Sequence, residues 1–355
     1  MKICVYTIAK NESSFIERWY QSAKDADELL VFDTGSTDET VEVCKQLGIK
    51  IFAGSVNPWR FDTARNTALS LVSADIDYCI SLDADEVLVD GWREHMEGLE
   101  ANVTRPRYKY TWSWNPDGSE GLVYGGDKIH SRNGYRWKHP VHEVLTKTPE
   151  SPEVQSWIGL EIHHFPDSEK SRSQYGPMLE LAALEDPKDD RIAFYYGREL
   201  VYYNELDKAY DQLKHHLSLP TALWGPERAA SKRLIAKCRP EEAEYWLLSA
   251  ASEAADRREP WVDLASYYYE KSEWVQCFSS ALRAISIQEK PLEYICDADA
   301  WGSKPYDLAA IASYRLGNED CLAYGEMAVT IDPEDVRLIS NLAHYESFVN
   351  GLEEE

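Results

Sequence analysis

Short apolar runs alternate with amphipathic stretches along the first 90 residues of the chain. The apolar runs have the length of strands and span residues 3–8, 29–32, 49–52 and 78–82. The stretches between them have the period of helices and span residues 13–24, 37–47 and 62–72. Because strands that alternate with helices form crossover units, this pattern predicts an α/β domain with a mainly parallel sheet.

The pattern changes over residues 100–165, which are rich in aromatic residues and in turn signals such as Asn115-Pro116-Asp117-Gly118. We expect antiparallel strands and long loops here, which complete the first domain. From residue 175 the chain becomes rich in Ala, Leu, Tyr and Glu with helical spacing. These changes predict a first domain over residues 1–174 and an all-helical second domain over residues 175–355.

The second domain repeats. Gly197 and Ser231 occupy matching positions 34 residues apart, and Ala265 follows at the same offset. A fourth copy over residues 308–333 comes after an insertion of about ten residues near 294–301. This spacing resembles tetratricopeptide (TPR) repeats and predicts about four helix pairs, with a capping helix over residues 336–350.

Composition and charge limit the kinds of partner that we expect the chain to bind and indicate its compartment. The chain has 37 basic and 62 acidic residues and a formal charge of -25, which disfavours bulk binding to nucleic acid or anionic lipid. Seven scattered cysteines without a C-x-x-C motif indicate thiols in a reducing compartment. No apolar stretch approaches the roughly 20 residues of a transmembrane helix. We therefore expect a cytoplasmic protein without a transmembrane segment.

Acidic side chains follow two of the predicted strands. Asp83 and Asp85 come directly after the fourth strand, where two carboxylates can hold a hard cation such as Mn²⁺ or Mg²⁺ and so bridge a diphosphate. Asp33 follows the second strand, where a carboxylate can accept hydrogen bonds from a nucleobase or a ribose. Ligands bind at the carboxyl ends of the strands in such sheets, so these residues predict a nucleotide site that needs a metal ion.

Four motifs together resemble the family 2 glycosyltransferases of the GT-A fold, the Rossmann-like fold of nucleotide-diphospho-sugar transferases. They are residues 7–12 (TIAKNE), 33–38 (DTGSTD), 61–66 (FDTARN) and 83–86 (DADE). The resemblance covers residues 1 to about 170. It implies that Asp33 and Arg65 lie near the base and ribose, Asp83 near the nucleotide, and Asp85 on the metal, with a UDP-sugar as the favoured donor.

The segment around Glu143 resembles the part of these enzymes that carries the acceptor-side carboxylate. Transfer with inversion needs a base to take the proton of the acceptor hydroxyl, and we assign this role to Glu143. Asp117 and Asp127 are the alternatives. A further alternative is that Glu143 is only paired with a nearby Arg or Lys.

Two adjacent histidines and a basic segment close the first domain. Neighbouring side chains of a strand point to opposite faces, so only one of His163 and His164 should reach the metal. By resemblance to family members we choose His164. Lys170, Arg172 and Tyr175 follow, on a stretch that could close over the donor and neutralise the departing diphosphate.

The sequence thus predicts a hexosyltransferase that moves a sugar from a nucleotide diphosphate to a hydroxyl. Helical repeats hold peptides and also form dimers, so we expect them to bind the acceptor or a second copy of the chain. The acceptor stays open among protein or peptide, saccharide, lipid-linked sugar and modified DNA. The alternative function is a TPR scaffold with an inactive transferase-like domain. Nucleotidyl transfer is disfavoured because no Gly-rich loop follows the first strand.

Overall fold

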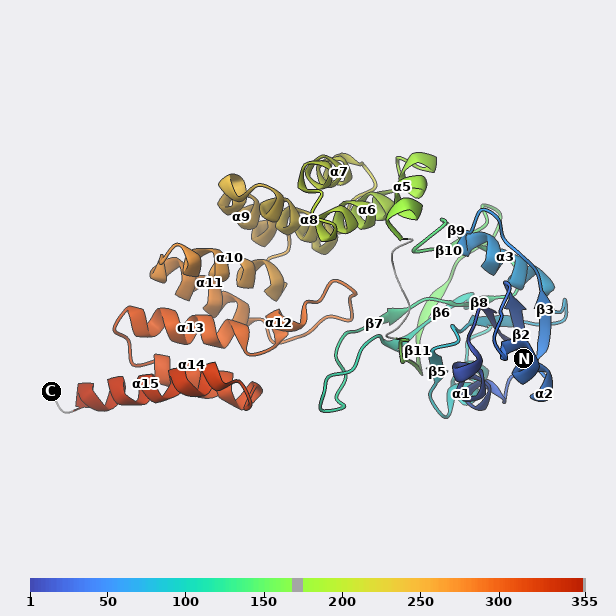
Figure 1. Ribbon diagram of the computed structural model, residues 1–355, viewed down its shortest axis with the longest axis horizontal. Helices are drawn as coiled ribbons and strands as arrows, with labels where there is room; N and C mark the ends of the chain where they lie inside the picture. The colour runs from blue at the N-terminus through green and yellow to red at the C-terminus, as the bar shows by residue number, and fades with distance from the viewer. Residues whose placement is uncertain (168–174, 354–355) are drawn as a thin grey trace. The chain divides into compact units, whose positions relative to one another are not determined.

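The structure is a computed structural model that describes residues 1–167 and 175–353 (Figure 1). It divides into two compact units. The first comprises Met1–Glu185 with Leu292–Tyr294, and the second comprises Asp186–Pro291 with Ile295–Glu355. Helix α5 (Tyr175–Glu185) therefore falls in the first unit, whereas the composition change led us to expect a boundary at residue 174.

The first unit is built on a five-stranded sheet of order β3-β2-β1-β4-β8. The first four strands are parallel, and β8 runs antiparallel to β4. The strands are β1 (Ile3–Ala9), β2 (Glu28–Asp33), β3 (Lys50–Ala53), β4 (Tyr78–Ser81) and β8 (Ile129–Ser131). The connecting helices are α1 (Ser13–Ala23), α2 (Thr40–Gln46) and α3 (Phe61–Leu71). The predicted alternation of strands and helices is confirmed.

Alternating side chains of β1 fill two hydrophobic clusters. Ile3 and Val5 belong to the cluster that includes Trp19 of α1, whereas Cys4 and Tyr6 belong to the cluster that includes the alanines of α3. Because successive residues of a strand point to opposite faces, helices cover both faces of the sheet. This burial leaves the carboxyl ends of the strands to form the site.

A second sheet of order β5-β11-β6-β7 completes the unit. Its strands are β5 (Glu86–Leu88), β6 (Arg105–Thr111), β7 (Val123–Gly126) and β11 (Gln155–His164). β11 pairs antiparallel with β5 and parallel with β6, so the expectation of antiparallel strands holds only in part. Helix α4 (Trp92–Glu97) and a hairpin of β9 (Tyr135–Lys138) and β10 (Val144–Lys147) complete this part of the chain.

The second unit is all helical, as predicted. Its four helix pairs are α6 (Asp190–Tyr202) with α7 (Leu206–Ser218), α8 (Gly225–Cys238) with α9 (Ala243–Glu253), α10 (Arg258–Glu270) with α11 (Trp274–Ser286), and α13 (Lys304–Arg315) with α14 (Cys321–Ile331). The short α12 (Ala298–Trp301) lies in the predicted insertion, a 3₁₀ turn spans Pro240–Glu242, and α15 (Val336–Glu353) is the capping helix.

Small residues allow the paired helices to approach closely. A Cβ atom on Gly197 of α6 would lie 2.7 Å from the Leu213 side chain of α7, and one on Gly325 of α14 would lie 2.7 Å from the Tyr345 ring of α15. These positions explain why small residues recur in the repeat. Among the described residues, no helix combines the length and the apolar character that a membrane crossing requires.

Candidate active site

Strand pairing brings the D-x-D tripeptide next to the histidine pair. Asp83 and Asp85 lie between β4 and β5, and Glu86 of β5 is directly opposite His164 of β11. The backbone N–H of Phe165 donates to the carbonyl of Asp85 at 2.9 Å. Residues almost 80 positions apart in the sequence are therefore held at one sheet edge by the backbone.

The His164 ring faces Asp85. Its Nε2 lies 3.3 Å from Asp85 Oδ2, and its Nδ1 lies 2.9 Å from the carbonyl oxygen of Trp112. A carbonyl only accepts hydrogen bonds, so Nδ1 carries the proton and Nε2 of the neutral ring has a lone pair for a cation. Burial lowers the pKa of His164, but its hydrogen bonds to Asp85 and to the Trp112 carbonyl outweigh burial and raise this pKa above its ordinary value. His164 Nε2 and the Asp85 carboxylate are therefore suited to bind a divalent cation.

His163 points to the opposite face of β11. Its Nε2 lies 3.6 Å from Glu161 Oε2, and its ring meets the Trp114 ring edge to face with centroids 4.9 Å apart. Glu161, Glu120 and His163 form a small cluster in which the Lys109 ammonium contacts both carboxylates. Of the two histidines, the structure thus brings His164 to the D-x-D tripeptide.

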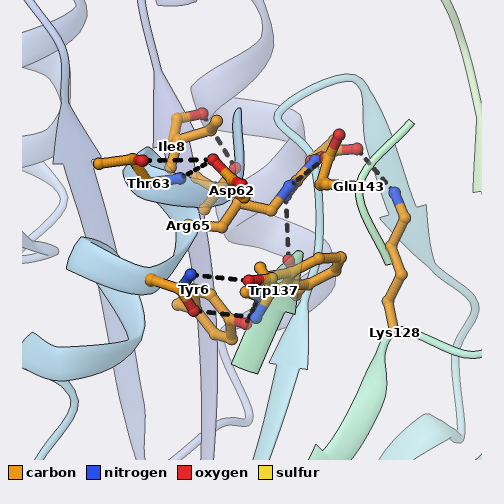
Figure 2. A network of polar contacts seen from close by, with 12 residues as sticks. Tyr6, Ile8, Asp62, Thr63, Arg65, Lys128, Trp137 and Glu143 are labelled. Atoms are coloured by element: carbon orange, nitrogen blue, oxygen red, sulfur yellow. Dashed lines mark hydrogen bonds and ion pairs between the residues drawn. The ribbon is translucent and has the colours of Figure 1, made fainter. Parts of the chain in front are cut away.

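Arg65 connects Asp83 with Glu143, and Figure 2 shows its guanidinium beside Glu143. Its NH2 atom lies 2.7 Å from Asp83 Oδ1, and its Nε donates to Glu143 Oε1 at 2.5 Å. The guanidinium also lies over the Trp137 ring, 4.9 Å from its centroid. The pairing of Glu143 with an arginine, noted as an alternative from the sequence, is therefore present beside the predicted nucleotide residues.

Two residues complete this network: Lys128, which the sequence did not indicate, and Glu86, which belongs to the 83–86 motif but had no predicted role. Lys128 Nζ lies 2.7 Å from Asp83 Oδ2 and 3.1 Å from Glu86 Oε1. Glu86 also accepts hydrogen bonds from the Tyr110 hydroxyl at 2.7 Å and the Asp83 N–H at 2.8 Å. Lys128 directly precedes β8, and only the pairing of β8 with β4 brings it to Asp83. No local sequence signal marks that pairing.

Burial and cations act in opposite directions on this network. Burial raises the pKa of Asp83, but Arg65 and Lys128 outweigh it and hold that pKa well below its usual range. Burial raises the pKa of Glu86, with the Asp83 charge adding to the effect and the Lys128 charge opposing it. Burial lowers the pKa of Lys128, but Asp83 and Glu86 raise it well above its ordinary value. Asp83 and Lys128 are therefore both charged at neutral pH.

The segment that carries Glu143 is held by α3. The Asn66 side chain donates to the Trp137 carbonyl and accepts from the Trp137 N–H, both at 2.9 Å, and the N–H of Phe61 donates to the Pro140 carbonyl at 3.0 Å. His139 and His142 have positive φ angles of 82° and 49°. Such backbone is uncommon outside glycine and persists where its surroundings enforce it.

Asp33 lies at the end of β2 and is 3% exposed. Its carboxylate accepts hydrogen bonds from the backbone N–H groups of Gly35 and Ser36, each at 3.2 Å. The positive φ of Gly35, 107°, allows this tight turn. Asp33 thus shapes the loop that follows β2.

The remaining predicted residues are distributed as follows. Tyr175 starts α5, and its ring centroid lies 5.8 Å from that of His142 and 6.5 Å from that of Phe61. Lys170 and Arg172 lie outside the described residues. Asp117 is in an exposed turn and accepts from Ser119, while Asp127 is paired with Arg105. The structure therefore joins Glu143, and neither alternative base, to the Asp83 network through a described contact.

Comparison with known proteins gives matches to both units. Residues 4–116 match the family model described as Glycosyl transferase family 2. An uncharacterized glycosyltransferase of Rickettsia bellii is 34% identical over 108 residues, which cover 30% of this chain and 35% of that protein. A TPR repeat-containing protein of Synechococcus elongatus is 25% identical over 316 residues, which cover 80% of this chain and 75% of that protein.

A third relative is the SPbeta prophage-derived glycosyltransferase SunS of Bacillus subtilis, 27% identical over 229 residues that cover 59% of this chain and 52% of that protein. Among solved structures, S. aureus TarS gives a TM-score of 0.43 at 12% identity and covers 73% of this chain and 56% of that chain. YrrB, described as a TPR protein with an unusual peptide-binding site, gives a TM-score of 0.39 at 13% identity, covering 48% of this chain and 84% of that chain.

Proposed function

We propose that this chain, which carries a family 2 glycosyltransferase domain followed by a TPR-like helical region, is a metal-dependent inverting hexosyltransferase. It moves a sugar from a nucleotide diphosphate, with UDP favoured, to a hydroxyl acceptor. The observation that carries the proposal is the contact between His164 Nε2 and Asp85, with Nδ1 tied to a backbone carbonyl. A histidine fixed in this tautomer is suited to binding a metal.

Asp85 and His164 are the residues that would hold Mn²⁺ or Mg²⁺. When bound, the cation neutralises the negative charge of the leaving diphosphate. Asp83, Asp33 and Arg65 surround the nucleotide in this proposal, with Arg65 fixing the orientation of Asp83. Lys170, Arg172 and Tyr175 are proposed to approach the diphosphate from the segment after β11.

Glu143 is the proposed base. Arg65 holds its Oε1, so Oε2 is the oxygen that takes the proton of the acceptor hydroxyl. The acceptor oxygen forms a bond to the anomeric carbon while the bond from that carbon to the diphosphate oxygen breaks, and the electron pair leaves with the diphosphate. Attack from the face opposite the leaving group inverts the anomeric configuration.

The repeats are proposed to bind the acceptor, a protein, peptide or saccharide, or to form a homodimer. Large side chains stay exposed on them, including Tyr202 at 82%, Leu223 at 81% and Tyr245 at 66%. Aromatic residues that are already ordered on a helix bind partners at a low entropic cost. The seven cysteines are buried thiols, which supports the cytoplasm as the compartment of this activity.

A panel of nucleotide sugars tests the proposal. With Mn²⁺ present, one donor should be hydrolysed slowly without acceptor and should raise the melting temperature of the chain. Asp85→Ala should abolish the hydrolysis, and EDTA should abolish it in the wild type until Mn²⁺ is restored. Donor turnover that is indifferent to both changes would overturn the metal assignment, and a panel without any response would favour a TPR scaffold.

A further inference from the structure

Lys128 lies between two carboxylates of the D-x-D segment. Its ammonium contacts Asp83 Oδ2 at 2.7 Å and Glu86 Oε1 at 3.1 Å. Glu86 is almost fully buried, at 1%, whereas 26% of the Lys128 side chain is exposed. Lys128 therefore bridges a buried carboxylate, Glu86, and a partly exposed one, Asp83, whose side chain is 29% exposed.

The two aspartates of the tripeptide differ in what neutralises them. Asp83 has a cation on each oxygen, Arg65 on Oδ1 and Lys128 on Oδ2. Among the described residues, Asp85 has no such pair of cations and faces the His164 ring, whose Nε2 lies 3.3 Å from its Oδ2. Asp85 thus contacts a side chain that can itself be a metal ligand, whereas both oxygens of Asp83 are paired with basic side chains.

An ammonium and a divalent cation compete for the same kind of oxygen. Oxygen ligands lie roughly 2.1 Å from Mg²⁺ and about 2.8 Å from an ammonium nitrogen, so small side-chain movements would convert one arrangement into the other. With the lysine absent, Asp83 and Glu86 would form a pair of carboxylates that attracts hard cations. Repulsion between the lysine and an approaching divalent ion prevents this.

We propose that Lys128 is a built-in cation that keeps Asp83 and Glu86 from binding a divalent ion and so confines metal to Asp85 and His164. The second part of this inference rests on the proposed function, whereas the first concerns Lys128 alone. Lys128 acts through Asp83 and Glu86, and is therefore a positioning residue.

Exclusion of a cation by Lys128 and a purely structural role of Lys128 lead to different experimental results. If Lys128 only balanced the charge of Glu86, its removal would destabilise the first unit without creating a new ligand site. If it excludes a cation, its removal should create a metal site that the wild type lacks. Metal binding without nucleotide distinguishes the two, and does not depend on activity.

The experiment is a titration of the chain of residues 1–355 with Mn²⁺ in the absence of nucleotide. Calorimetry and the electron paramagnetic resonance signal of free Mn²⁺ both measure the number of ions bound. Lys128→Met should bind one Mn²⁺ per chain more than the wild type. Lys128→Arg keeps a cation at this position and should bind the wild-type number. Asp83→Asn added to Lys128→Met should remove the additional ion. A folded Lys128→Met variant with wild-type stoichiometry would overturn the inference.

A second variant covers the case in which Lys128→Met does not fold. Glu86→Gln combined with Lys128→Met removes both charges and keeps an amide oxygen able to accept from Tyr110 and the Asp83 N–H. The Asp83 carboxylate and the Gln oxygen should still bind the additional Mn²⁺, at least tenfold more weakly than a carboxylate pair. No additional ion in this folded double variant would also overturn the inference.

The outcome for Asp85 separates this inference from the proposed function. Asp85→Asn should lose the wild-type Mn²⁺, and the increment caused by Lys128→Met should persist in the Asp85→Asn background. If the wild type binds no Mn²⁺ and Lys128→Met binds one, the metal assignment of the proposed function fails while the exclusion by Lys128 stands. If Lys128→Met binds no additional Mn²⁺ in the Asp85→Asn background, the two ions share one site, and the proposed exclusion by Lys128 is overturned.

Discussion

At the scale of single residues, a substitution of Glu143 tests sugar transfer separately from donor binding. Glu143→Gln keeps an oxygen that accepts from Arg65 but cannot take a proton, so kcat should fall by about 10²–10⁴-fold with donor affinity unchanged. Steady-state kinetics and a donor titration measure the two effects. Glu161→Gln is the matched control, because Glu161 lies beside Lys109 and His163 and, among the described contacts, not in the Asp83 network, and it should keep the wild-type kcat. An unchanged kcat in Glu143→Gln would reassign the base.

The second prediction at this scale concerns the proton on His164. Its raised pKa means that the folded chain binds this proton more tightly than the unfolded chain, so the pair with Asp85 stabilises the fold at acid pH and loses that effect as pH rises through the folded-state pKa. Mn²⁺ must displace the proton, so its affinity should change in the opposite sense, falling up to tenfold per pH unit below that pKa.

Mn²⁺ titrations between pH 5.5 and 8 measure this dependence. His163→Asn should keep it, because His163 faces Glu161 on the other side of the strand. His164→Asn should weaken Mn²⁺ binding and flatten the pH dependence. An affinity that stays constant with pH in the wild type would contradict the prediction.

Sequence reasoning reached most of these residues but not Lys128. Asp83 and Asp85 were found because they follow an apolar strand, and Arg65, Glu143 and His164 because they stand in motifs that resemble a family. Lys128 stands in neither context. Its position depends on β8 pairing with β4 across more than 40 residues, and single-sequence periodicity carries no information on strand partners.

At the scale of elements, the contact between α3 and β9 positions the segment that carries Glu143. Asn66→Ala would leave the N–H and the carbonyl of Trp137 without their partner, at a cost of about 1–3 kcal/mol for each group that water does not reach. We expect a lower melting temperature and a kcat reduced at least tenfold, with donor affinity nearly unchanged. Differential scanning calorimetry and kinetics measure these effects.

Thr67→Ala is the control for this prediction. Thr67 is the next residue of α3, and its hydroxyl bonds only within the helix, to the Thr63 carbonyl, among the described contacts. It should leave kcat and the melting temperature close to the wild-type values. A kcat retained in Asn66→Ala despite a lower melting temperature would show that the contact stabilises the fold without positioning Glu143.

The elements themselves were largely predictable, whereas their ends and partners were less so. Residues 37–39 were expected in a helix, yet α2 begins at Thr40. Residues 36–38 instead bond to the loop after β1 and to the start of α1. The Thr37 N–H donates to the Asn11 side chain, the Asn11 N–H to the Ser36 hydroxyl, and the Ser13 N–H to the Asp38 carboxylate. Long-range hydrogen bonds of this kind override local helix signals.

At the scale of the whole molecule, the two units have separate hydrophobic clusters. The two large clusters around the main sheet take their residues from 3–162, and the clusters within the repeats take theirs from 193–349. A change in composition was enough to predict two domains. The assignment of α5 to the first unit depends on spatial contacts such as that of Tyr175 with His142, which composition does not report.

A fragment of residues 1–185 should therefore fold without the repeats. All described residues of the proposed donor and metal site lie within it, and it keeps α5, whose Glu185 pairs with Arg60 at 2.6 Å. We expect it to bind Mn²⁺ and nucleotide sugar with affinities within a few-fold of the full chain, and to lose transfer to the native acceptor. A fragment of residues 1–174 lacks Tyr175 and Glu185 and should melt at a lower temperature.

Circular dichroism, calorimetry and donor titration of both fragments measure these properties. A 1–185 fragment that aggregates would show that the catalytic unit depends on the repeats for folding, and one that transfers to the acceptor as efficiently as the full chain would remove acceptor binding from the functions of the repeats.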